Sequence, residues 1–108
     1  MTTDERRRLE AAIAGWVTEV PGVAYLSPRL TRRLTSRPGA ADGVRLRHTE
    51  PVTVEVRVAV RPGHQAAATA RAVRDRISGE RGAQPALAGS RIEVIVTACL
   101  DPAGRADA

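Results

Sequence analysis

VTVEVRVAV, the stretch at residues 52–60, places a valine at every second position. Because side chains of an extended strand alternate between its two faces, the five valines share one face. The other face carries Thr53, Glu55, Arg57 and Ala59. β-Branched residues also favour strands, so pattern and propensity agree. The stretch therefore predicts a half-buried strand whose valine face lies against a hydrophobic layer.

A helix is predicted near the start of the sequence. Thr2 followed by Glu5 fits a capping box, in which each side chain accepts the backbone N–H of the other residue. Pro21-Gly22 stops the helix, because proline lacks a donor and disfavours the helical conformation of the residue before it. Glu10 is predicted to lie off the apolar stripe. That stripe, at three- and four-residue spacing, contains Leu9, Ala12, Ile13, Trp16, Val17 and Val20.

A second helix is predicted over residues 65–78, after Pro62-Gly63 ends the valine strand. Its apolar face is narrow and flat, which suits close packing on the valine row. Gly79 is predicted to end the helix in the left-handed conformation. The apolar face contains Ala66, Ala67, Ala70, Val73 and Ile77.

Three further strands complete the predicted sheet. An edge strand is predicted over residues 23–33, because Pro28 is tolerated at a sheet edge. A short strand over residues 44–48 forms an antiparallel hairpin with the valine strand, and a closing strand follows at residues 92–99. The valine strand, second helix and closing strand favour a right-handed crossover, which makes the closing strand parallel to the valine strand.

These elements predict an α+β fold in which a small mixed sheet of three or four strands carries two helices on one face, in the order α-β-β-β-α-β. Residues 1–100 form one domain, and residues 101–108 form a flexible tail. Because both helices cover the valine face, the opposite face is predicted to be open to water or to a partner. That face carries Arg45, Arg47, Thr53, Glu55, Arg57, Glu93 and Thr97.

The positive charge of the chain comes entirely from arginine. The sequence contains 17 arginines and no lysine, with a formal net charge of +5, which favours attraction to polyanions and anionic lipids. An excess of arginine over lysine also accompanies a GC-rich genome, so the charge alone is weak support for nucleic-acid binding. Modules that stack bases usually display several aromatic rings, whereas this chain has only Trp16 and Tyr25.

No catalytic, cofactor or metal site is predicted. Cys99 is the only cysteine, so an intramolecular disulfide is excluded and a reducing compartment fits. His48 and His64 have no companions at catalytic or metal-binding spacing. The chain starts without the apolar run of a signal peptide and contains no run of about 18 apolar residues, the length of a membrane span. We therefore expect a non-enzymatic, cytoplasmic protein that contacts membranes only peripherally.

Seven arginines are the candidate partner-binding residues. Three lie on the predicted open face: Arg45, Arg47 and Arg57. The other four belong to the most basic segment, in which no acidic residue separates them: Arg29, Arg32, Arg33 and Arg37. One interpretation is a solvated edge whose charges block edge-to-edge aggregation. The other is a docking patch for an acidic partner, an anionic lipid or RNA.

The ordered set of motifs resembles the alkaline-shock-protein family of Gram-positive bacteria, also described as envelope stress response proteins. The resemblance covers residues 9–100 and includes E-V-P-G-V at residues 19–23 and G-V at residues 43–44. It continues with the valine strand ending at Gly63, the helix at residues 66–77 and I-E-V-I-V at residues 92–96. Many members have an extra G-x-V-x-I strand before the first helix. This chain lacks that strand and therefore resembles a short form of the family, in which either a sheet edge is left free or the domain is truncated.

The resemblance implies a non-enzymatic, membrane-proximal adaptor or scaffold that works through protein-protein contacts in the envelope stress response. It implies a small membrane-anchor protein or a family paralogue as the partner, and association with the inner face of the cell membrane through that partner. It is also compatible with a homo-oligomer. It implies no cofactor and assigns no binding residues to this chain.

An RNA-binding alternative depends on the G-x-x-G formed by Gly79 and Gly82. The motif follows a helix-strand-strand-helix order and resembles the loop with which a type II KH domain clamps a nucleic-acid backbone. Glu80 places a negative charge in this loop, and Pro85 and Gly89 leave little room for the helix that should follow. Helix termination followed by a flexible link is the simpler interpretation of these glycines. Nucleic acid therefore ranks below protein as the predicted partner.

Overall fold

The computed structural model describes residues 2–27 and 43–99 and has the predicted order of helices and strands. Helix α1 (Thr3–Thr18) is followed by strands β1 (Val23–Leu26), β2 (Val44–Arg47) and β3 (Thr53–Val60). Helix α3 (Ala66–Glu80), the short 3-10 helices η1 (Arg81–Ala83) and η2 (Pro85–Leu87), and strand β4 (Arg91–Cys99) complete the fold. The predicted tail at residues 101–108 and the part of the predicted edge strand beyond residue 27 lie outside the described residues.

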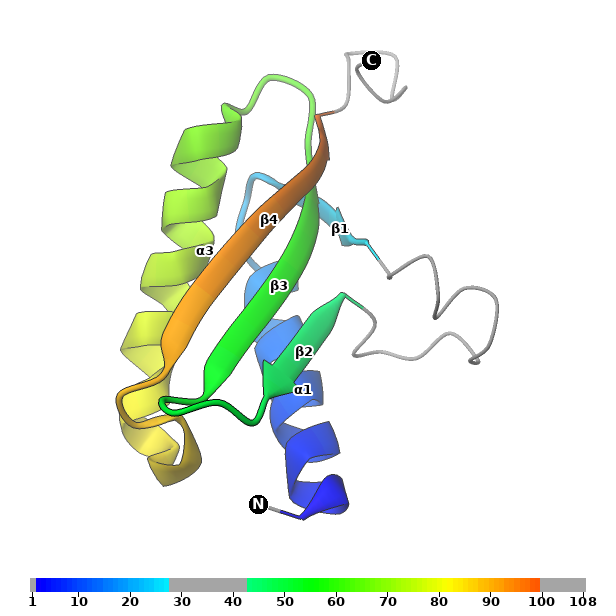
Figure 1. Cartoon of the computed structure of the whole chain (residues 1–108). Coiled ribbons are helices and arrows are strands. Elements are labelled where there is room, and N and C mark those ends of the chain that lie inside the picture. The colour runs from blue at the N-terminus through cyan, green and yellow to red at the C-terminus, as the bar shows by residue number, and fades with distance from the viewer. Residues whose placement is uncertain (1, 28–42, 100–108) are drawn as a thin grey trace.

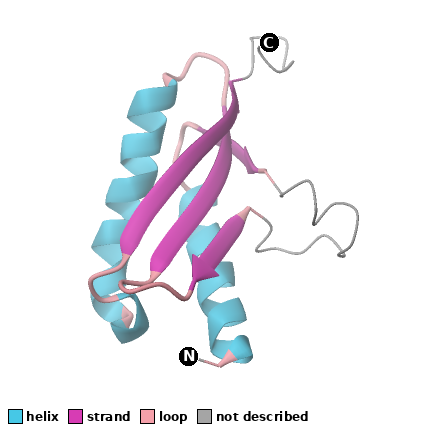
Figure 2. Cartoon of the chain, viewed as in Figure 1, coloured by secondary structure: helices cyan, strands magenta, loops and turns pink. Residues whose placement is uncertain are grey.

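Strand β3, which contains the valine row, is the centre of a mixed four-stranded sheet (Figures 1 and 2). Strand β2 pairs antiparallel with its first half, where Leu46 lies opposite Val54. Strand β1 pairs antiparallel with its second half, so β1 and β2 lie end to end along one side of β3. Strand β4 pairs with the other side in the parallel direction, with Val94 beside Val56. The predicted hairpin and the predicted parallel closing strand are both confirmed.

The junction between β1 and β2 depends on Gly43. The N–H of Ser27 donates to the carbonyl of Arg57 at 2.8 Å, and the N–H of Arg57 donates to the carbonyl of Gly43 at 2.8 Å. Gly43 has φ of 91°, in the left-handed region that favours glycine. A Cβ atom at this position would also lie 2.8 Å from the Cβ of Leu26. Both conformation and space therefore require glycine where β2 begins.

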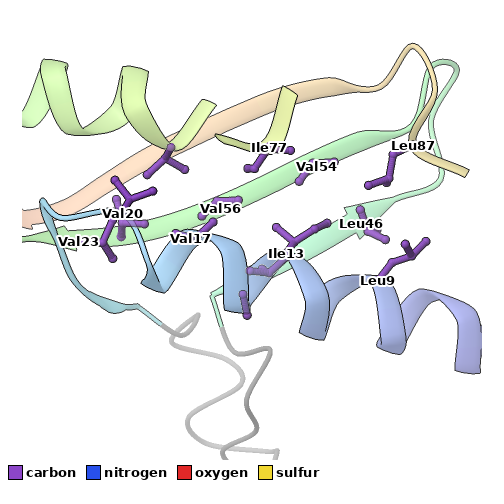
Figure 3. Close-up of a cluster of buried hydrophobic side chains, with 14 residues drawn as sticks. Leu9, Ile13, Val17, Val20, Val23, Leu46, Val54, Val56, Ile77 and Leu87 are labelled. Atoms are coloured by element: carbon purple, nitrogen blue, oxygen red, sulfur yellow. The ribbon is translucent and has the colours of Figure 1, made fainter. Parts of the chain in front are cut away.

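Both helices pack on the valine face of the sheet, as the sequence predicts. Figure 3 shows Ile13 and Val17 of α1 and Ile77 of α3 in one cluster with Val54 and Val56 of β3. All five side chains are 0% exposed. Burial of one such side chain contributes about 1.5–3 kcal/mol to stability. We call this side of the sheet the helix face and the opposite side, which no described helix covers, the open face.

Helix α1 begins at the predicted capping box but buries a residue that was predicted to lie off its apolar stripe. The N–H of Glu5 donates to Thr2 Oγ1 at 3.1 Å, and the N–H of Thr2 donates to Glu5 Oε2 at 3.3 Å. Glu10 is only 4% exposed, and its Oε2 accepts the N–H of Leu46 at 2.9 Å. Because β2 is an outer strand, this carboxylate satisfies a backbone donor at the sheet edge. The prediction for Glu10 was therefore wrong.

Helix α3 packs against the turn that connects α1 to β1. A Cβ atom on Gly22 would lie 2.3 Å from the Oγ1 of Thr69, so the absence of a side chain at Gly22 lets the helix approach the turn. Thr69 is buried and Ala67 is exposed. The prediction that Ala67 widens the apolar face was wrong, because the helix turns Thr69 rather than Ala67 toward the rest of the protein.

Helix α3 also continues past its predicted end. Gly79 lies inside the helix, which ends at Glu80, and the cap residue Arg81 has φ of −65° and ψ of −18°. The predicted left-handed conformation of Gly79 was therefore wrong. The 3-10 helix η1 follows α3 directly, so the chain continues in right-handed geometry where the glycine was expected to reverse it.

Candidate protein-docking surface

The open face is buried along its centre and exposed along its rim. Thr53 and Glu55 on β3 are 4% and 5% exposed. The hydroxyls of Thr49 and Thr53 are hydrogen-bonded at 2.8 Å, and Arg47 reaches toward Glu55 from β2. Side chains of the flanking segments thus cover the central strand. The prediction that Thr53 and Glu55 are open to water was wrong.

Arg47 contacts two carboxylates of the open face. Its Nη2 donates to Glu93 Oε2 at 3.3 Å, and its Nε lies 3.9 Å from Glu55 Oε2. The guanidinium therefore connects β2 to β3 and to β4. Because the Arg47 side chain is 38% exposed, solvent screens these ion pairs, and each contributes at most about 1 kcal/mol. Arg47, a predicted partner-binding residue, has acidic partners within its own chain.

Tyr25, Arg45 and Arg57 occupy one side of the open face, and we call them the docking row. Arg45 on β2 is exposed and Arg57 on β3 is half-buried, while Tyr25 on β1 is 48% exposed. Arg45 pairs with position 55 of β3 and Tyr25 with position 59, so Arg57 lies between them. Alternate residues of a strand are about 7 Å apart, which gives the row a length of about 14 Å.

Tyr25 reaches the open face through a β-bulge. Strict alternation from the buried Val23 places Tyr25 in the core. The pairing instead shifts between the two residues, with Val23 opposite Val60 but Tyr25 opposite Ala59. Bulges redirect side chains in this way. Sequence reasoning missed Tyr25 as a site residue, because the bulge arises from pairing with β3 and carries no local signal.

The basic segment borders the docking row in sequence. Its four predicted partner-binding residues lie outside the described residues: Arg29, Arg32, Arg33 and Arg37. Ser27 and Gly43, the described residues on either side of the segment, both hydrogen-bond to the backbone of Arg57. Ser27 and Gly43 therefore lie beside Arg57, in the middle of the docking row.

The residues considered for catalysis or metal binding lie on different parts of the fold. His48 and His64 are exposed, and Cys99 is half-buried at the end of β4. Across residues 2–27 and 43–99, no cluster of three or more His, Cys, Asp or Glu is placed to hold a metal ion. In the same two ranges, no helix has the length and apolar character needed to cross a membrane.

The G-x-x-G motif is helical. Gly79 belongs to α3 and Gly82 to η1. A Cβ atom on either glycine would meet nothing within 4 Å, and neither residue has positive φ. Local structure therefore does not require glycine at these positions, and the KH-like alternative stays a prediction.

Replacing Gly79 with alanine is expected to stabilise the protein by about 0.5–1 kcal/mol, because glycine loses more conformational freedom in a helix. Denaturant unfolding followed by circular dichroism measures this change. Gly63→Ala is the matched control, because a Cβ atom there also meets open space but φ is 82°, so the control should be destabilised. Destabilisation by Gly79→Ala would contradict the helical placement of the motif.

The docking row is the described surface that combines an exposed aromatic ring with cationic side chains. Next to this row, the hydroxyls of Ser27 and Thr97 form a hydrogen bond that connects the end of β1 to β4 across β3. This arrangement suits non-covalent recognition of an anionic surface. In comparisons with protein-family models, curated proteins and solved structures, the chain has no significant match.

Proposed function

We propose that this protein is a non-enzymatic adaptor that binds an acidic segment of a partner protein on the open face of its sheet. The observation that carries the proposal is the docking row, in which Tyr25 and Arg45 are exposed on either side of Arg57. Both described helices lie on the other face, so no described layer covers this row (Figure 2).

The chemistry of the docking row favours an acidic protein segment. Tyrosine and arginine are enriched at protein interfaces, where tyrosine offers apolar area and arginine forms charge-assisted hydrogen bonds to carboxylates. Arg45 and Arg57 lie diagonally on the neighbouring strands β2 and β3, whereas Glu55 is buried beneath the flanking side chains. The net charge of +5 adds long-range attraction for an acidic partner. Binding should therefore weaken as salt increases.

The resemblance to alkaline-shock proteins supplies a biological setting for this proposal. In that setting the chain acts in the cytoplasm during the envelope stress response, and its partner is a small membrane-anchor protein or a paralogue. The chain is then held at the inner face of the membrane through that partner. The support for this setting consists of the sequence motifs together with the α+β architecture that they predict.

A pull-down from a membrane fraction tests the proposal. Tagged wild-type protein should retain a membrane-linked protein with an acidic segment. The double variant Arg45→Glu and Arg57→Glu should retain at least about tenfold less, because two charge-assisted contacts become repulsive. Raising the salt concentration should release the partner from the wild type.

The matched control is Arg71→Glu with Arg74→Glu, which makes the same charge change on exposed positions of α3. This control should bind like the wild type. Equal loss in both double variants would show that overall charge, rather than the docking row, attracts the partner. Recovery of RNA without a membrane-linked protein would instead favour the KH-like alternative.

A further inference from the structure

Strand β4 forms a border of the sheet that is incompletely covered. Among the described strands it pairs with β3 alone, and Figure 1 shows it as the border strand, between β3 and the α3 ribbon in this view. Val54, Val56 and Val58 of β3 are fully buried. Their neighbours on β4 pack on the same core yet remain partly exposed: Ile92, Val94 and Val96. The row of core side chains therefore reaches the surface at this edge.

The backbone of β4 presents a regular series of hydrogen-bonding groups at the same edge. The N–H of Arg91 donates to the carbonyl of Val52 at 2.9 Å. In a parallel ladder, alternate residues of a strand bond to the same neighbour, so Arg91, Glu93 and Ile95 bond to β3. The residues that direct their N–H and C=O groups outward are Ile92, Val94 and Val96.

This edge lacks most of the features that prevent strand pairing. Natural edge strands are protected by lysine, proline, bulges or inward-pointing charges. Residues 92–96 contain one charged residue, Glu93, and neither proline nor lysine. The bulge of β4 falls after them, between Val96 and Ala98. A regular apolar edge of this kind is a template for another strand.

We propose that this edge binds the β4 edge of a second copy of the chain, antiparallel, about a two-fold axis at Val94. Val94 then lies opposite its own counterpart, and Ile92 lies opposite Val96 of the second copy. Each of the three outward-directed residues in each copy has one N–H and one C=O, so the pairing forms six hydrogen bonds. The exposed rims of the same three side chains cover one another, which continues the helix-face core across the dimer.

The charges on β4 favour this register over its neighbours. Glu93 lies opposite Ile95 of the second copy, and Arg91 lies opposite Thr97. A slip by two residues in one direction places Glu93 opposite its own counterpart, and directly opposed like charges are destabilising. A slip in the other direction places Ile92 opposite Ala98, beyond the bulge that interrupts the regular edge.

Charge variants at Ile95 test both the interface and its register. Ile95→Glu places a carboxylate opposite Glu93 twice in each dimer and should weaken dimerisation about tenfold. Ile95→Lys removes the same apolar contact but places an ammonium group opposite Glu93, so its dimer Kd should stay within about threefold of the wild type. Sedimentation equilibrium measures the Kd, and circular dichroism checks that each variant is folded.

Amide hydrogen exchange of the wild type gives an independent test that needs no variant. On raising the protein concentration through the dimer Kd, the amides of Ile92, Val94 and Val96 should gain protection, while those of Glu93 and Ile95 are protected throughout. A wild type that stays monomeric up to about 1 mM, which corresponds to a binding free energy of about −4 kcal/mol, would overturn the proposal. So would a dimer without added protection at Val94, or equal weakening by Ile95→Glu and Ile95→Lys.

This dimer is independent of the proposed adaptor function. The two sites adjoin, because Arg57 of the docking row lies beside Ile95 of β4 in the sheet, so each variant is measured in both the pull-down and the dimerisation assay. A wild type that dimerises through β4 but retains no partner in the pull-down would overturn only the adaptor proposal. A monomeric protein that still binds its partner would overturn only the β4 pairing.

Discussion

Ile77→Ala is expected to lower the free energy of unfolding by about 3 kcal/mol. Ile77 is fully buried on α3 and belongs to the cluster with Ile13, Val54 and Val56 shown in Figure 3. Truncation removes apolar surface from the core and leaves a cavity, because α3 is held in place by its other contacts with the sheet. Urea unfolding of wild type and variant, with a common m value, measures the difference.

A graded series makes this result interpretable. Ile77→Val removes one methylene group and should cost only about 0.5–1.5 kcal/mol. Arg74→Ala on the exposed side of the same helix should change stability by less than about 0.5 kcal/mol. If Ile77→Ala and Arg74→Ala had equal effects, Ile77 would not lie in the core, and the packing of α3 on the valine row would be wrong.

Glu10→Ala is expected to cost about 2 kcal/mol, although surface glutamates usually contribute little. The Glu10 carboxylate accepts the N–H of Leu46 at 2.9 Å in a buried hydrogen bond between α1 and β2. Alanine cannot accept this bond, so the backbone donor loses its partner in a site with little water. Urea unfolding measures the loss, and the amide of Leu46 should exchange faster with solvent.

Two substitutions separate the hydrogen bond from the charge. Glu10→Gln retains a side-chain oxygen that accepts the Leu46 N–H, so it should recover most of the lost stability. Glu19→Ala removes an exposed glutamate from the C-terminal cap of α1, where its ion pair with Arg76 at 2.9 Å is solvent-screened, and should cost under about 1 kcal/mol. An equal loss in Glu10→Ala and Glu19→Ala would contradict a buried role for Glu10.

Short-range patterns were enough to predict the elements and their order. The valine row follows from the period of two in a strand, and the start of α1 follows from Thr2 and Glu5 alone. The hairpin follows from the closeness of β2 and β3 in sequence, and the parallel β4 follows from the handedness of a crossover. These signals depend on neighbouring residues and on chain chirality, so they are present in a single sequence.

The candidate site was less accessible from sequence. Arg45 was predicted on the open face and is exposed there, whereas Arg47 forms ion pairs with Glu55 and Glu93 that only the pairing of three strands creates. Tyr25 was not predicted as a site residue, because the bulge that exposes it depends on the register between β1 and β3. The arginines of the basic segment lie outside the described residues and stay predictions.

The sequence by itself determined the type and order of the helices and strands, and which face of the central strand is apolar. Tertiary structure decided the rest: Glu10 is buried because α1 crosses the edge of β2, and Glu55 is buried because neighbouring strands supply covering side chains. Tertiary structure also decided that β4 is an edge strand of the described sheet. The physical reason is that local sequence patterns depend only on neighbouring residues along the chain. The burial of a polar group depends instead on groups that folding brings from distant positions.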